Sequence, residues 1–165
     1  MLNSTAQNWL KGLHISFGAA WIGAGASILL LSYVKGFPGD ELYAVSAAQK
    51  FLDDRIVVPA AYGSLITGIL YSWLTEWGFF KFTWVAVKWV LMVAQIVFAS
   101  AWLGRWINDA SAITAARKGM APLNPAYLHD QLMIARFGPL QVAFLVVMVF
   151  VAVLKPWGKR NRRPA

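Results

Sequence analysis

Residues 79–109 read FFKFTWVAVKWVLMVAQIVFASAWLGRWIND, and this stretch decides the fold class. Its middle is apolar over more than the roughly 20 residues that an α-helix needs to cross a bilayer. Within it, a seven-residue repeat of mostly polar side chains consists of Lys81, Lys88, Gln95, Trp102 and Asp109. Seven residues make two helical turns, so these side chains lie near one stripe. Because a lysine facing lipid at the bilayer centre costs on the order of 3 kcal/mol, we expect the stripe to face other protein.

The composition is that of a membrane protein. Hydrophobic residues make up 59% of the 165 and charged residues 13%, and nine Trp and ten Phe suit rings at headgroup level. Much of the net charge of +8 lies in a tail containing Lys155, Lys159, Arg160, Arg162 and Arg163. A basic tail beside a hydrophobic segment favours membrane lipids over nucleic acid as the partner. The lack of cysteine excludes disulfides, thiolate metal sites and thiol catalysis.

Four hydrophobic segments follow one another, and we expect spans at about residues 9–34, 56–77, 82–107 and 132–154. The very short turn after Glu76 predicts that the second and third spans are antiparallel neighbours. Residues 35–50 carry turn residues and then a helical stretch outside the hydrocarbon, and residues 111–131 predict a loop with a short surface helix. The sequence therefore predicts one all-α domain over residues 1–165, an antiparallel four-helix transmembrane bundle.

The orientation of the bundle follows from its flanking cations. With four spans, both termini lie on the same side of the membrane. Lysines and arginines near the span ends are nearly balanced between the two sides, and the dense basic tail then decides the orientation. We expect both termini to be cytoplasmic.

Several polar residues share one depth in the half of the bundle that holds the termini. Lys88 lies seven residues beyond Lys81, about 10 Å into the span at 1.5 Å per residue. The side chains expected to converge there are His14, Lys88, Tyr71 and Thr75, with Glu76 as the candidate counter-ion.

Each of the two central residues has an alternative role. His14 is a candidate ligand of haem iron, because neutral imidazole is the usual protein ligand, or else a histidine that is hydrogen-bonded near a helix end. Lys88 is a candidate to hold an acidic group or to move a proton, or else a lysine that extends its stem to the interface.

A second polar group lies toward the opposite face. Arg136 is expected to pair with Asp54 or Asp109 and so to hold helix ends together. His129 and Asp130 are adjacent and are either metal ligands or solvent-exposed. His14 and His129 lie near opposite faces, so we do not expect both to ligate one haem.

The first segment, LKGLHISFGAAWIGAG, resembles the LH…W pattern that opens several small bacterial families of four-helix membrane proteins. VVPAAYGSLITGILYS and WVAVKW resemble the Pro…Thr-Gly and Trp…Lys helices of the membrane protoporphyrinogen oxidase that works without molecular oxygen. The copper-resistance D domain family and an uncharacterised bacterial integral-membrane family are similar at the same level, and the uncharacterised family is the nearest match.

The resemblance implies a location in the bacterial cytoplasmic membrane and a site. In the oxidase family the histidine of the first helix and the lysine of the third are the key residues, and haem b is bound. These residues correspond to His14 and Lys88, with His14 on the haem iron. The family's Tyr-Leu-Pro-Arg motif is absent here, where the chain reads LLLSYVKG, and this departure bears more on porphyrinogen oxidation than on haem binding.

The leading hypothesis is a small membrane protein that binds haem or porphyrin in a redox or haem-handling role. The alternative is a non-catalytic accessory or metal-handling protein whose polar stripe only stabilises packing. Ion or proton movement along Lys88, Gln95 and Asp109 is a third hypothesis. Enzymatic activity, homo-oligomerisation and a redox partner stay open at this stage.

Overall fold

The computed structural model describes residues 2–34 and 39–157, and helices make up nearly all of them. In chain order these are α1 Ser4–Tyr33, α2 Gly39–Leu52, η1 Asp53–Val57, α3 Val58–Leu74, α4 Thr83–Phe98, η2 Ala99–Leu103, α5 Gly104–Arg117, η3 Lys118–Leu123 and α6 Pro125–Leu154. The elements η1 and η2 are π-helices and η3 is a 3₁₀-helix. The described ranges contain no β-sheet.

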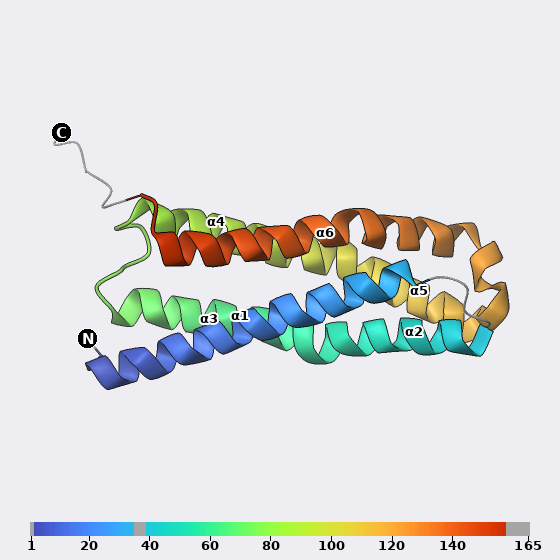
Figure 1. Cartoon of the computed structure of the whole chain (residues 1–165), viewed down its shortest axis with the longest axis horizontal. Coiled ribbons are helices and arrows are strands. Elements are labelled where there is room, and N and C mark those ends of the chain that lie inside the picture. Colours follow the sequence, from blue (N-terminus) through green and yellow to red (C-terminus); the bar gives the residue numbers. More distant parts are fainter. Residues whose placement is uncertain (1, 35–38, 158–165) are drawn as a thin grey trace.

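The short elements join their neighbours into four long helices. These run over Ser4–Tyr33, Gly39–Leu74, Thr83–Leu123 and Pro125–Leu154, and each is long and apolar enough to cross a membrane. Consecutive long helices run antiparallel in an elongated bundle, with the start of α1 and the end of α6 at the same end (Figure 1). The prediction of an all-α antiparallel four-helix bundle is confirmed.

The helical stretch expected before the second span is confirmed as α2. The sequence did not predict its continuity with that span, because α2 continues through η1 into α3 without a break. No glycine or proline between residues 40 and 58 interrupts it. In a regular α-helix the Pro59 ring would clash with the Arg55 carbonyl, and the wider π-helix directly before Pro59 accommodates the ring.

The expectation of a loop with a short surface helix over residues 111–131 is wrong. The α5 helix continues to Arg117, η3 follows directly, and Asn124 separates it from α6. The Asn124 side chain accepts a hydrogen bond from the Ala126 N–H at 2.9 Å, which caps the start of α6. Pro125 occupies the first helical position, where its missing N–H costs little. Capping chemistry thus replaces the expected loop with a tight corner.

The helices are longer than a membrane is thick. Helices of 36 and 41 residues span about 54 and 62 Å, against roughly 30 Å of hydrocarbon. Measured from the end that holds the termini, one hydrocarbon thickness is reached near Arg55, Arg105 and Arg136. Beyond that level the bundle continues as α2, most of α5 and the start of α6. The buried polar residues of this extension are Ser46, Gln49, Ser111, Thr114 and Asp130, as suits helices packed in water.

Packing at the end that holds the termini divides the helices into two pairs. There α1 packs on α3 and α4 packs on α6, while α1 and α6 also contact each other (Figure 1). As expected, α3 and α4 run antiparallel, but they are not among the helices in close backbone contact although a short turn joins them (Figure 1). The core lies where the pairs meet, around Trp21, Ile134 and Leu145.

Four of the five tail cations lie outside the described residues, so the orientation stays a prediction. The chain has no cysteine, which makes single-cysteine labelling in intact cells direct. Thr5→Cys should resist a membrane-impermeant thiol reagent, whereas Met120→Cys, at an exposed position in η3, should react. Val147→Cys, on the apolar face of α6, should react only after denaturation. Reaction at position 5 with protection at position 120 would invert the topology.

Candidate functional site

His14 is held on α3 by a hydrogen bond across the α1–α3 contact. Its Nδ1 lies 2.9 Å from the Thr67 Oγ1. The Thr67 hydroxyl also lies 2.6 Å from the Gly63 carbonyl oxygen, to which it donates. A hydroxyl has one proton, so a Thr67 that donates to Gly63 accepts from the imidazole Nδ1–H. In this tautomer the Nε2 of His14 carries a free lone pair, which is the arrangement that a metal-binding histidine needs.

Two glycines of α3 allow this close approach. A Cβ at Gly63 would lie 2.6 Å from Phe17 ring atoms, so the ring lies directly on the α3 backbone. A Cβ at Gly68 would lie 3.5 Å from His14 Cε1 and 3.9 Å from Trp89 Cη2. Side chains of α1 and α4 therefore meet over Gly68, and Trp89 bridges two helices whose backbones stay apart.

Lys88 precedes Trp89, whose ring approaches Gly68 from α4 as His14 does from α1. Lys88 is thereby placed toward the same part of the bundle as His14, but the two side chains form no hydrogen bond with each other within the described residues. Lys88 is half-buried, and no carboxylate of the described residues pairs with it. The expected counter-ion Glu76 is exposed, and its backbone carbonyl accepts a hydrogen bond from Lys81 at 3.1 Å.

The other two predicted site residues take part in ending α3. The Thr75 hydroxyl donates to the Tyr71 carbonyl oxygen and lies 3.4 Å from the Trp77 nitrogen. Within the described ranges, neither Tyr71 nor Thr75 forms a hydrogen bond with His14 or Lys88. A contact of these two residues with a cofactor stays a prediction.

The heptad stripe faces protein over only part of its length. Lys88 is half-buried and Gln95 is 5% exposed, but Lys81, Trp102 and Asp109 are exposed. The π-helix η2 lies between Gln95 and Asp109 and adds a residue to the helical turn, which shifts the following side chains by about 100°. The expectation of one continuous inward stripe is therefore wrong beyond η2.

Gln95 instead joins α4 to α6. Its Nε2 lies 3.5 Å from the Gln141 carbonyl oxygen, and the Gln141 Nε2 donates to the Gln95 carbonyl oxygen at 3.2 Å. Two amide groups thus bind each other's backbones in mid-span, where lipid offers no partners. This part of the stripe stabilises packing.

A cavity of about 50 Å³ lies between the two π-helices, α1 and α6. Asp53 is the charged residue of its wall, and a Cβ at Gly104 would lie 3.6 Å from the Asp53 Oδ2. The space suffices for one or two waters. Neither His14 nor Lys88 lines it. The residue pattern does not predict this cavity, because it lies between two local departures from the α-helix.

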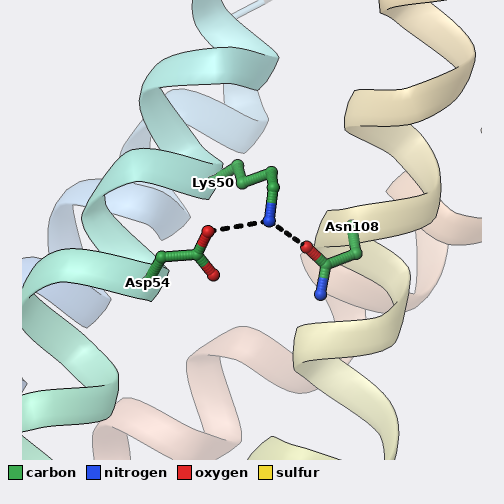
Figure 2. A network of polar contacts seen from close by, with 3 residues as sticks. All are labelled: Lys50, Asp54 and Asn108. Atoms are coloured by element: carbon green, nitrogen blue, oxygen red, sulfur yellow. Dashed lines mark hydrogen bonds and ion pairs between the residues drawn. The ribbon is translucent and has the colours of Figure 1, made fainter.

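The far group of polar residues is arranged differently from the expectation. Arg136 is exposed and forms no ion pair within the described part of the chain. Lys50 pairs with Asp54 at 2.7 Å and reaches the Asn108 amide on α5 (Figure 2). Asp54 is satisfied one turn away on its own helix, whereas Arg136 points away from the bundle. The expected pairing of Arg136 is wrong.

The pair His129 and Asp130 does not form a metal site in the described residues. His129 is exposed and Asp130 is buried, and no cluster of three His, Asp or Glu side chains capable of holding a metal ion is found there. A haem needs only one protein ligand, so this result bears on the far group and not on His14.

Comparison with protein-family models, with curated proteins and with solved structures finds no match to this chain.

The α1–α3 contact predicts a large effect from one methyl group. Gly63→Ala forces a Cβ into the Phe17 ring and should destabilise the protein by about 1–3 kcal/mol, seen as a lower melting temperature in detergent. Gly18→Ala is the matched control: it lies in α1 with nothing within 4 Å of the added Cβ, and should be neutral or stabilising. Equal melting temperatures for the two variants would contradict the Phe17–Gly63 contact.

Proposed function

We propose that this protein binds a haem or porphyrin between the α1–α3 pair and the α4–α6 pair, in a redox or haem-handling role. The observation that carries the proposal is the orientation of His14. Its Nδ1 is engaged by Thr67 at 2.9 Å, which leaves Nε2 as the ring nitrogen available to a metal.

The lone cation supports an anionic ligand. An ammonium group in the hydrocarbon region without a counter-ion is costly, and a bound ligand with a negative charge would remove that cost. A porphyrin propionate supplies one and forms a charge-assisted hydrogen bond with Lys88. The residues present therefore fit haem b through one nitrogen ligand and one propionate partner.

A flat ligand would enter between α3 and α4, which are not in close backbone contact. Trp89 bridges these helices, and its ring centroid lies 5.6 Å from that of Phe79. These aromatic side chains would form an apolar wall beside the ligand and keep water from the iron-binding nitrogen of His14. Bound haem b supplies a one-electron iron couple, and the chain supplies its ligand, its charge partner and a dry environment.

The resemblance to the oxygen-independent protoporphyrinogen oxidase family points to the same two residues, His14 and Lys88. Because the Tyr-Leu-Pro-Arg motif of that family is absent, the proposal is haem or porphyrin binding rather than porphyrinogen oxidation. We place the protein in the bacterial cytoplasmic membrane with both termini in the cytoplasm.

The alternative function, a non-catalytic accessory protein, is favoured by the reciprocal bonds of Gln95 and Gln141, which show that part of the stripe stabilises packing. In that case Lys88 extends its stem to the interface. Ion movement along Lys88, Gln95 and Asp109 has less support, because Asp109 is exposed beyond η2.

The absorption spectrum of the purified protein tests the proposal. The wild type, as isolated or after addition of haemin, should show a Soret band, and His14→Ala should lose it while its melting temperature stays similar. His129→Ala, an exposed histidine at the far end, should keep the band. A wild-type protein that takes up no haemin would contradict the proposal and leave the accessory role.

The Lys88→Met variant distinguishes two roles of Lys88: binding a propionate through its charge, or extending its side chain to the interface. If Lys88 holds a propionate, this change should weaken haemin binding about tenfold or more, since charged hydrogen bonds contribute about 1.5–3 kcal/mol. Lys81→Met, at an exposed position one heptad earlier, should leave the affinity unchanged. Equal affinity for the two variants would remove Lys88 from the site.

A further inference from the structure

Two arginines that form no ion pair with the described residues, Arg105 and Arg136, lie at the level where the bundle leaves the hydrocarbon. Arg136 is about 27 Å from Leu154 along α6, and Arg105 is about 33 Å from Thr83 along α4, η2 and α5. Both distances match the roughly 30 Å of the hydrocarbon core. The side chains are exposed, and within the described ranges neither pairs with a carboxylate, including Asp109 one turn beyond Arg105.

The packing of α5 on α6 brings the two arginines to one side. Trp106 and Phe137 stack across the contact with ring centroids 5.8 Å apart, and Arg105 and Arg136 each directly precede one of these rings. One residue corresponds to about 100° around a helix. Because α5 and α6 run antiparallel, the two backward steps turn to the same side of the pair, which is its exposed face.

Aromatic rings from α4, η2 and α6 pack against one another near the two arginines. Phe98 stacks on Trp102 at 5.6 Å and lies 5.7 Å from Phe137, and Trp102 is 48% exposed. Tryptophan at this depth favours the headgroup region. We name as the arginine–aromatic patch the residues Phe98, Trp102, Arg105, Trp106, Arg136 and Phe137.

We propose that the arginine–aromatic patch binds the headgroup phosphate of an anionic phospholipid. Packed helix axes lie about 8–10 Å apart, a separation that two arginine side chains can bridge to reach one phosphate. Guanidinium groups bind phosphate oxygens in a bidentate manner, and a phosphodiester supplies the negative charge that the described carboxylates do not. The acyl chains follow the apolar outer face of α6, where Leu140, Phe144 and Val147 are exposed.

Binding of phosphatidylglycerol to the detergent-purified protein, titrated by native mass spectrometry, tests this proposal. A basic residue near an anionic lipid surface contributes about fivefold in affinity. Arg105→Gln and Arg136→Gln should each raise the apparent Kd about fivefold, and the double variant about 25-fold. Phosphatidylcholine binding should not change. Where the double variant fails to fold, the two single variants decide.

Arg55→Gln is the matched control. Arg55 is exposed at the same depth but belongs to η1, away from the aromatic rings, and its loss should change the Kd less than twofold. An equal loss in Arg55→Gln would show nonspecific attraction to positive charge and overturn the proposal. Full displacement of the lipid by inorganic phosphate would overturn it too, because the site would then bind free phosphate. Unchanged affinity in both single variants would also exclude the patch.

Discussion

The free-energy cost of keeping the Lys88 ammonium in hydrocarbon is the main constraint on the proposed site. Lys88 lies about 8 Å beyond Thr83, where α4 begins, half-buried and without a carboxylate partner among the described residues. The protein could have removed this cost with an apolar residue. It retains a lysine instead, toward the same part of the bundle as a histidine whose orientation is fixed by Thr67. An ammonium group and a free imidazole nitrogen together suit a ligand that carries both a metal and a negative charge.

The close contact of α1 with α3 supports that orientation. The glycines at positions 63 and 68 let Phe17 and His14 lie against the α3 backbone, and Thr67 lies between the two glycines in sequence. Small residues at such contacts allow the short separations on which helix packing in membranes depends. On the other side of the site α4 packs on α6 and stays apart from α3. One wall of the proposed site is thus rigid, and the other is formed largely by aromatic side chains.

The sequence was sufficient for the fold class, because the apolar length of each helix follows directly from residue spacing. It was not sufficient for features that depend on exact helical phase. The π-helix at Ala99–Leu103 turns Trp102 and Asp109 outward. The residue pattern around it does not predict that one extra residue is inserted into the helical turn. Charged residues such as Asp53 and Asp54 can mark either the end of a helix or the point where a continuous helix leaves the membrane, and the sequence pattern does not distinguish the two. Arg136 was assigned a carboxylate partner on proximity alone, although Lys50 had the better position for Asp54.

The most direct test of the account is the state of the His14 ring, measured by ¹⁵N NMR on the histidine-labelled protein with His14 and His129 assigned by substitution. The account predicts a neutral His14 imidazole with the proton on Nδ1. It also predicts that adding gallium protoporphyrin, a diamagnetic stand-in for haem, shifts the Nε2 signal of His14 and leaves that of His129 unchanged. A His14 ring protonated on Nε2 that does not respond to the metalloporphyrin would contradict it.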